Sequence, residues 1–445
     1  MVPEPPNRRL VIVVRADPVI CGHSGEARNL AEAALLRGFD DVRIVTWPLE
    51  ALTRLPLKPL ESVLPYSPGI TVERPAAVGD YKVPDGRYSA GMVGRLVELF
   101  SEDVPTVCLS LYLMPHAGIV LEALAICRSM GRHPRVTTVA EAVGSDITNV
   151  VRSCVDHERF GAAAQAFTSY LGHDHCVAVS QYTKDCIVEA ADLVDAHWGS
   201  TFGAQCRARI GISYPAIDTR SSAPGDEVVA EALTRRGLER DGYLLFLSRV
   251  TPEKGVDDLI DGFERSAAND RVRLVIAGTG SALDAMRERA GRSSVAHRIL
   301  FMDDVDDAEK WSLMAGCAAF VLPSKPTEAF VETFCITLVE KMLAGGGPVI
   351  TTSTGGIPEA VGDTATTVPV SSPHAVAAAI DEVVLGLSVD ERRTRESIAR
   401  EHALQFDRLR VFDALFGHLP ADPSGGQPIT LSDLALLEPL AEGSA

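Results

Sequence analysis

The sequence predicts an α/β protein of two doubly wound, Rossmann-like domains, each built on a parallel sheet and the two facing a central cleft. Short, continuous apolar runs alternate with amphipathic stretches, which is the pattern of strands buried on both faces of a parallel sheet. The runs fall into two groups, one in each half of the chain. The predicted strands are 10–14, 42–47, 104–111, 135–140 and 176–180, then 243–248, 272–278, 298–302, 318–323 and 348–352.

Chain length and one polar break predict the domain boundaries. At 445 residues the chain is too long for a single core of ordinary size. The segment 218–227, which contains Pro and Ser, separates the two groups of strands and is the expected hinge. We therefore expect a first domain over residues 1–220 and a second over 221–400. In the C-terminal segment, 401–445, we expect a helix that packs back toward the first domain and then a flexible tail.

Composition excludes several kinds of partner. The net charge of −18 leaves no basic stripe for a phosphate backbone, so we expect no nucleic-acid partner. No apolar run approaches the roughly 20 residues that span a bilayer, and the N-terminus lacks the layout of a signal peptide. The nine cysteines are scattered without a C-x-x-C pair, which indicates reduced thiols and no zinc site. We expect a cytoplasmic protein without membrane insertion.

Two glutamates eight positions apart, Glu332 and Glu340, are the most informative pair in the chain. They follow an apolar run closed by Pro-Ser (318–324), so one lies at the carboxyl end of a strand and the other inside the next helix. Ligands bind at that edge of open α/β sheets. Helical spacing separates the pair by roughly 12 Å at about 1.5 Å per residue, which suits the two ends of one extended ligand better than a shared proton. From spacing alone, a solvated helix face is equally compatible.

Two cations follow the first predicted strand of the second half. Arg249 and Lys254 flank a turn there, where an arginine fork and a lysine point charge can together neutralise a diphosphate. Taken alone, the segment reads more simply as a solvated surface turn.

Two glycine-bearing loops also end predicted strands. Ser24 and Gly25 immediately precede a predicted helix, whose N-terminus attracts phosphate. Gly278 and Gly280 permit close approach to the backbone. Each loop by itself is more simply a turn, so the prediction of a ligand site depends on the coincidence of all these features at strand ends.

Five motifs in order, LSRVTPEKG, VIAGTG, VLPS, ETFCITLVE and GGGPVITTSTGGIPEAV, resemble the C-terminal half of glycosyltransferase family 4, whose members are retaining enzymes of GT-B fold. The resemblance is close over residues 240–385. It is looser over the first half, where CGHSGEARNLAEAALLRGF, VAVSQYTKD and SYPAID are similar to the family's glycine loop, V-S strand end and interdomain stretch. It implies sugar transfer from a UDP- or GDP-sugar with retention at the anomeric carbon, without a metal or another cofactor.

The resemblance also implies roles for individual residues. Glu332 matches the first glutamate of the E-x7-E motif, which contacts the donor sugar, and Glu340 matches the second, which contacts the ribose. Arg249 and Lys254 match the pair that holds the diphosphate, so the implied catalytic residues are Glu332, Arg249 and Lys254. The implied donor-binding set is Ser24, Gly25, Arg249, Lys254, Gly278, Gly280, Val305, Glu332, Thr333, Phe334, Cys335, Ile336 and Glu340.

Three positions depart from the family pattern. Cys335 stands where the family usually has glycine, and the usual Gly-Gly of the N-terminal loop reads Ser24-Gly25. The family's histidine near the sugar is replaced by Val143. His116, Glu141 and Asp146 are the candidates for the missing contact with the sugar or the acceptor.

The function implied is that of a retaining hexosyltransferase that acts on a hydroxyl of a small soluble acceptor in natural-product biosynthesis. A GT-B epimerase or phosphorylase and a catalytically lapsed nucleotide-sugar-binding protein stay open as alternatives. A nicotinamide dehydrogenase is disfavoured because no G-x-G-x-x-G follows a predicted strand. The donor base and sugar, the acceptor and the oligomeric state stay open.

Overall fold

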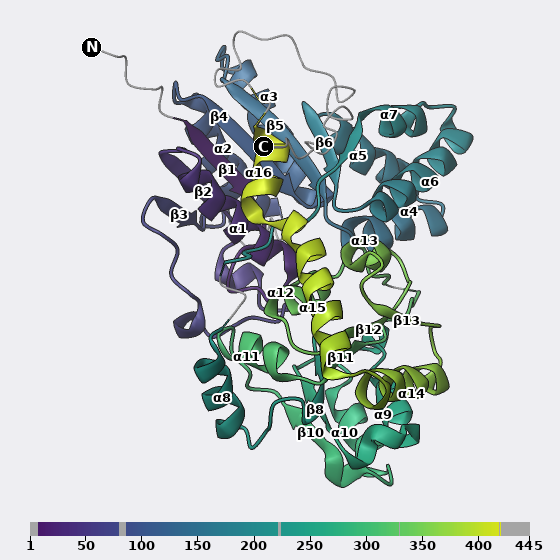
Figure 1. Ribbon diagram of the computed structural model, residues 1–445. Coiled ribbons are helices and arrows are strands. Elements are labelled where there is room, and N and C mark those ends of the chain that lie inside the picture. Colours follow the sequence, from purple (N-terminus) through teal and green to yellow (C-terminus); the bar gives the residue numbers. More distant parts are fainter. Residues whose placement is uncertain (1–7, 80–85, 221–223, 329, 418, 420–445) are drawn as a thin grey trace, which may run out of the picture. The chain divides into compact units, whose positions relative to one another are not determined.

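The computed structural model describes residues 8–79, 86–220, 224–328, 330–417 and 419. The chain forms two compact units, each with its own sheet (Figure 1). The first comprises Met1–Ala216 and Arg408–Ala445, and the second is Ile217–Asp407. The divisions therefore fall a few residues from the boundaries expected at 220 and 401. Part of the expected hinge and the expected tail lie outside the described residues.

The first unit contains a seven-stranded parallel sheet in the order β3-β2-β1-β4-β5-β6-β7. Every residue of the two central strands, β1 and β4, is buried, which explains their continuous apolar sequences. The strands are β1 (Arg9–Val13), β2 (Asp41–Val45), β3 (Ile70–Glu73), β4 (Thr106–Leu111), β5 (Val136–Ala142), β6 (His175–Ala178) and β7 (Ile210–Ile212).

Helices cover both faces of this sheet. The helices are α1 (Gly22–Leu36), α2 (Gly86–Ser101), α3 (Gly118–Ser129), α4 (Arg152–Asp156), α5 (Phe160–Leu171), α6 (Gln181–Trp198), α7 (Phe202–Arg209) and α16 (Arg408–Phe416). Alternate residues of β1 point to opposite faces, so that Leu10 and Ile12 pack with α1 and α16, whereas Val11 and Val13 pack with α2 and α3.

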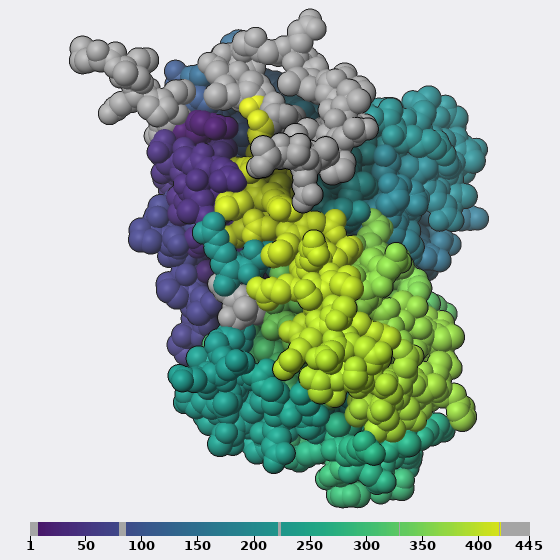
Figure 2. Space-filling view, in the orientation of Figure 1, coloured from purple at the N-terminus to yellow at the C-terminus, as the bar shows by residue number. Residues whose placement is uncertain are grey.

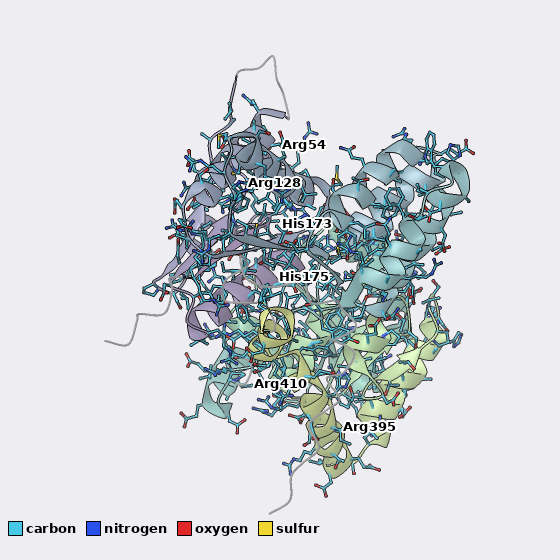
Figure 3. All side chains as sticks on the ribbon, turned by 90° about the horizontal axis from the view of Figure 1, so that it is seen from above. Arg54, Arg128, His173, His175, Arg395 and Arg410 are labelled. Carbon is cyan, nitrogen blue, oxygen red and sulfur yellow. The ribbon has the colours of Figure 1, made fainter. Side chains whose placement is uncertain are left out.

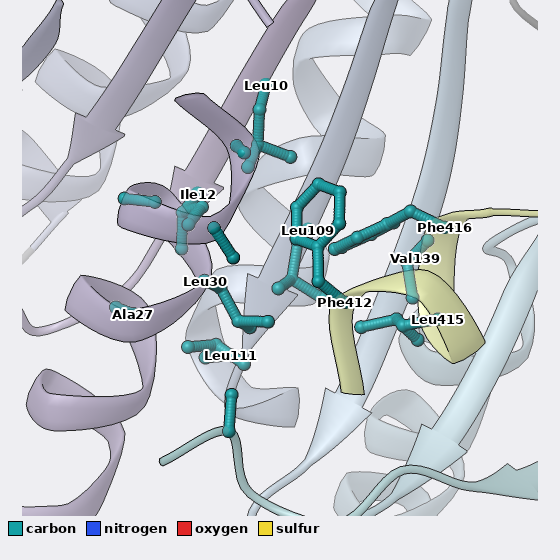
Figure 4. Close-up of a cluster of buried hydrophobic side chains, with 14 of the residues drawn as sticks. Leu10, Ile12, Ala27, Leu30, Leu109, Leu111, Val139, Phe412, Leu415 and Phe416 are labelled. Carbon is teal, nitrogen blue, oxygen red and sulfur yellow. The ribbon is translucent and has the colours of Figure 1, made fainter. Parts of the chain in front are cut away.

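Helix α16 joins the first unit although about 190 residues of the second unit precede it. It lies beside α1 (Figure 1) and buries Phe412, Leu415 and Phe416 in the core formed by α1, β1, β4 and β5 (Figure 4). Burial of each such side chain contributes roughly 1.5–3 kcal/mol. The first unit therefore depends on a segment from the far end of the chain.

The second unit contains a six-stranded parallel sheet in the order β10-β9-β8-β11-β12-β13. Its strands are β8 (Tyr243–Leu247), β9 (Arg273–Ala277), β10 (Ile299–Met302), β11 (Ala319–Leu322), β12 (Val349–Thr352) and β13 (Thr366–Val368). Its helices are α8 (Asp226–Arg235), α9 (Val256–Arg265), α10 (Leu283–Gly291), α11 (Glu309–Gly316), α12 (Ile336–Ala344), α13 (Ile357–Val361), α14 (Pro373–Asp381) and α15 (Val389–Ala403). Helix α15 forms a charged surface strip of this unit, yellow in Figure 2.

The prediction of two doubly wound parallel-sheet domains is confirmed. Each of the ten predicted strands overlaps an observed strand, and the three that the sequence did not predict, β3, β7 and β13, each lie at the edge of a sheet. None of the described helices is both long and apolar enough to cross a membrane.

Candidate functional site

The strand order of the second unit reverses between β8 and β11, and the loops that leave these strands carry the predicted catalytic residues. Doubly wound sheets bind ligands at such a switch point, outside the carboxyl ends of the strands. Lys254 ends a single 3-10 turn after β8, and Glu332 lies in the loop between β11 and α12. The Lys254 ammonium donates a hydrogen bond to the Glu332 carboxylate, so the structure brings these two predicted residues together.

The Lys254–Glu332 ion pair is buried, since each side chain retains only 7% of its accessible surface. Burial by itself disfavours both charges. The Glu332 carboxylate nevertheless raises the pKa of Lys254 above its ordinary value, and Lys254 holds the pKa of Glu332 below its own. The Phe330 ring lies 5.5 Å from the Lys254 ammonium and adds a cation–π contact. Both groups are therefore charged at neutral pH.

Arg249 adds a second cation beside this pair. Its side chain is exposed, and it makes no ion pair with any of the described residues. It acts electrostatically on both Lys254 and Glu332, which places it near them. Two cations and one carboxylate leave a net positive charge at the switch point, which favours an anionic ligand group.

Glycines hold the Glu332 loop close to its neighbours. A Cβ on Gly355 would lie 1.9 Å from the Glu332 carbonyl oxygen, and one on Gly356 would lie 1.9 Å from that of Thr333. The Gly356 N–H donates a 2.9 Å hydrogen bond to the Glu332 carbonyl. The loop after β12 therefore fixes the backbone that carries Glu332.

Gly278 and Gly280 serve the chain's own packing. A Cβ on Gly278 would lie 2.0 Å from the Ser248 carbonyl oxygen, and one on Gly280 would lie 2.3 Å from that of Val250. These two carbonyls flank Arg249, and Val250 also donates a 2.9 Å hydrogen bond to Thr279. The close approach expected at these glycines is thus made by the loop that carries Arg249.

Helix α12 begins directly after Cys335, whose backbone is left-handed (φ 78°, ψ 72°). This conformation suits glycine and is strained for other residues. The thiol of Cys335 is buried, and burial followed by the charge of the Glu332 carboxylate raises its pKa well above the ordinary value. The neighbouring Phe334 ring is buried and packs edge-on against Phe406 at 5.1 Å.

The second predicted carboxylate, Glu340, lies inside α12. Its Oε1 atom accepts a 2.7 Å hydrogen bond from the Lys310 ammonium of α11. Thr333, Ile336 and Val305, three further members of the predicted donor-binding set, are half-buried. Thr333 and Ile336 lie in the loop that leads into α12 and in its first turn, and Val305 lies in the loop after β10.

In the first unit, Ser24 and Gly25 lie within the first turn of α1, which begins at Gly22. The prediction that they precede the helix is therefore wrong, because the helix begins four residues earlier than predicted. The Ser24 hydroxyl is buried and donates a 2.6 Å hydrogen bond to the Arg15 carbonyl. Gly25 is exposed, and a Cβ there would meet nothing within 4 Å. The N-cap residue of this helix, Cys21, makes no side-chain capping hydrogen bond.

His116 is packed into the first unit with both ring nitrogens occupied. Its Nδ1 atom donates a 2.6 Å hydrogen bond to the Leu111 carbonyl, and its Nε2 atom accepts one of 2.8 Å from the Trp47 indole. Burial lowers the pKa of His116 to about 3, so the ring is neutral. Both ring nitrogens are thus paired within the first unit, and the contact of His116 with the sugar or the acceptor stays a prediction. His173, labelled in Figure 3, is likewise buried and donates to the Ala117 carbonyl.

Glu141 and Asp146 are also buried. Glu141 lies on β5 beside Glu26 of α1, and among the described residues no cation pairs with either carboxyl. Burial, reinforced by Glu26, raises the pKa of Glu141 well above its ordinary value. The Asp146 carboxylate accepts hydrogen bonds from the backbone N–H groups of Leu113 (2.9 Å) and Gly144 (2.8 Å). Asp146 therefore holds two backbone segments in place, whereas both carboxyl oxygens of Glu141 are buried without a hydrogen-bond partner among the described residues.

Lys310 is a site residue that sequence reasoning missed, because no spacing rule connects it with Glu340, thirty positions later. The roles of Gly355 and Gly356 were also missed, since their contacts depend on the packing of two loops. The described residues contain no group of His, Cys, Asp or Glu side chains that could hold a metal ion.

The fold is shared with proteins of known structure. Along 92% of its length the chain superposes on 99% of an Anabaena protein, HepE, solved with UDP and glucose, with a TM-score of 0.64 and 16% identity. It also superposes, over 92% of the chain and 99% of the other, on a Burkholderia xenovorans α,α-trehalose-phosphate synthase (UDP-forming), with a TM-score of 0.65 and 12% identity. The fold is that of the GT-B glycosyltransferases.

Within that class, residues 234–401 match the family described as "Glycosyl transferases group 1", and this segment lies wholly in the second unit. A D-inositol 3-phosphate glycosyltransferase from Mycobacteroides abscessus is 30% identical over 251 residues, which are 54% of this chain and 51% of the relative. One from Mycobacterium leprae is 29% identical over 237 residues, 51% of each. The chain thus spans about half the length of the curated relatives it matches.

Proposed function

We propose that the protein is a retaining glycosyltransferase, which moves a sugar from a nucleotide diphosphate sugar to a hydroxyl of a small-molecule acceptor. The observation that carries this proposal is the buried Lys254–Glu332 pair with the exposed Arg249 beside it, at the switch point of the unit that matches the group 1 family. In this proposal the second unit binds the donor and the first binds the acceptor.

The mechanism follows from the charges that develop as the bond between sugar and phosphate breaks. Positive charge grows on the sugar ring and negative charge on the leaving diphosphate. Arg249 and Lys254 stabilise the diphosphate, and Glu332, fixed by Lys254, receives the sugar hydroxyls. Since two cations supply the charge that a metal would bring, we propose a metal-independent reaction.

Retention requires that the acceptor attack from the face that the diphosphate leaves. The acceptor oxygen forms the new bond to the anomeric carbon as the phosphate–sugar bond breaks, and the acceptor's proton passes to the departing phosphate oxygen. The product then keeps the anomeric configuration of the donor. With His116 and Glu141 buried, no other base is assigned.

The names of relatives guide the choice of substrates. D-inositol 3-phosphate glycosyltransferases and trehalose-phosphate synthase are named for polyol or sugar phosphates, and the Anabaena HepE structure holds UDP and glucose. We therefore propose a UDP- or GDP-sugar as donor and a small polyol or sugar as acceptor, in a natural-product pathway. The nine free thiols favour a reducing, cytoplasmic setting.

Thermal-shift measurements with UDP, GDP, UDP-glucose and GDP-mannose test the donor assignment. One nucleotide base should raise the melting temperature, and Arg249→Ala should remove most of that rise. Arg292→Ala, which changes another exposed arginine of the unit at the end of α10, should leave it unchanged. The proposal fails if no nucleotide shifts the wild type, or if both variants respond alike.

A further inference from the structure

Each carboxylate of the Glu332–Glu340 pair is held by its own lysine. Lys254 from the loop after β8 binds Glu332, and Lys310 from α11 binds Glu340 with 2.7 Å between Nζ and Oε1. The two lysines come from different elements, so the arrangement is not a repeat of one local motif. The role of Lys254 belongs to the proposed reaction, whereas Lys310 has no role in it.

The start of α11 directs Lys310 toward Glu340. Asp306 accepts hydrogen bonds from the N–H groups of Ala308 (3.0 Å) and Glu309 (2.7 Å), which fixes the first turn. The Lys310 N–H in turn donates a 3.1 Å hydrogen bond to the Asp306 carbonyl. Helices α11 and α12 pack side by side, so the ammonium reaches across to the middle of α12.

The Lys310–Glu340 pair is more enclosed than an ordinary surface ion pair. The two side chains are only 20% and 18% exposed. Burial opposes the charge on Lys310, but the Glu340 carboxylate outweighs it and raises the pKa of the lysine. The Trp311 ring lies 4.8 Å from the same ammonium. These contacts restrict the lysine to one place, and through it the carboxylate.

We infer that Lys310 is a positioning residue that orients Glu340 toward the ribose of the donor and so makes the site prefer ribonucleotides over deoxyribonucleotides. This inference rests on the proposed function and on the ribose contact that the family resemblance implies for Glu340. A carboxylate that accepts hydrogen bonds from ribose hydroxyls must be ionised and correctly turned. Lys310 occupies Oε1, which leaves Oε2 and the remaining lone pair of Oε1 for the hydroxyls.

Calorimetric titration of the full chain with UDP, GDP and their 2′-deoxy and 3′-deoxy analogues tests the inference. The wild type should bind the ribonucleotide more tightly than at least one deoxy analogue. Lys310→Met should reduce that preference by about tenfold, the effect of one charge-assisted hydrogen bond. Lys310→Arg, which keeps the cation, should retain the preference. In a Glu340→Gln background, Lys310→Met should change the preference no further.

Lys325→Met is the matched control. This lysine is also ion-paired, but with Asp257 (2.8 Å) and Asp258 (2.9 Å) of α9, so its loss should leave the preference unchanged. If Lys310→Met fails to fold, Lys310→Gln serves in its place. If the wild type prefers the ribonucleotide and the Lys310→Met variant keeps the full preference, the inference is overturned and the proposed function stands. A wild type that binds no nucleotide overturns both.

Discussion

Replacing Lys254 with methionine should destabilise the second unit by about 3–5 kcal/mol, because the Glu332 carboxylate is left buried without its cation. Methionine keeps most of the apolar length of lysine, so the loss is of charge and not of packing. Both side chains are only 7% exposed, which removes most of the screening that water gives to surface pairs. Glu332→Gln should cost a similar amount by leaving Lys254 unpaired.

The double variant Lys254→Met/Glu332→Gln should be more stable than either single variant, because it buries no unpaired charge. Arg289→Met, which breaks the more exposed ion pair with Asp261, should cost only about 0–1 kcal/mol. Urea denaturation of the full chain at pH 8 measures all four. If the double variant is as unstable as the sum of the singles, the two charges do not depend on one another and the reasoning is refuted.

The stability of the same variants should change with pH in a direction that can be measured. In the wild type Lys254 lowers the pKa of Glu332 from 4.5, so the pair's contribution is present above pH 4.5 and is lost as the pH falls below it. In Lys254→Met the pKa of Glu332 should instead rise above 4.5. The difference in free energy of unfolding between that variant and the wild type should therefore shrink as the pH is lowered from 8 toward 4.5. A difference that grows on acidification would contradict the account.

Three further predictions concern single residues. Arg249→Ala should lower kcat/KM for the donor by about 10²–10³. Because the side chain of Arg249 is exposed, the melting temperature should not change. A loss of stability as large as the loss of activity would contradict a role in charge stabilisation. Cys335→Gly should raise the free energy of unfolding by up to about 1 kcal/mol in urea denaturation, since φ is 78°; a loss would mean that the thiol contact with Glu332 outweighs the strain. Burial raises the pKa of Glu26 from 4.5 to about 7. Glu26→Gln should therefore raise the free energy of unfolding by about 3 kcal/mol at pH 8, and should not raise it below pH 4.5. If the effect of the substitution is the same at both pH values, the pKa of Glu26 is not raised in the folded protein.

The strands that sequence patterning shows most clearly are those whose every face is covered. β1, β4 and β11 are buried at every residue and read as continuous apolar runs. The edge strands β3 and β13 are three or four residues long and have a single buried position between them, so their apolar signal is too short to separate from a loop. Three of the four edge strands therefore came only from the structure, whereas the fourth, β10, was predicted at 298–302.

The proximity of the candidate donor-side residues was predictable because the chemistry and the topology coincide. Strand ends bring Arg249, Lys254 and Glu332 to one edge of one sheet, and the sequence places all three at strand ends. What spacing could not predict is that Lys254 and Glu332 bond to each other, because an ion pair across 78 residues depends on how two loops pack. A substitution of Lys254 consequently affects both the fold and the site.

The candidates for the missing histidine show a second limit of sequence patterns, which concerns where a side chain points. His116 and Glu141 are polar residues near predicted strand ends, but whether a side chain there points to solvent or inward depends on the register of the strand. The structure turns both inward, one onto Leu111 and Trp47 and the other onto Glu26. Polar identity alone does not separate a ligand contact from a satisfied interior group.

The most direct test of the proposed function is the stereochemistry of transfer. The full chain is incubated with the nucleotide sugar that stabilises it and with a panel of polyol and sugar phosphates, and the anomeric proton coupling of the product is followed by NMR as the nucleoside diphosphate is released. The account predicts acceptor-dependent release and a product with the donor's anomeric configuration. An inverted product, or a donor that is bound but never transferred to any acceptor, would contradict it.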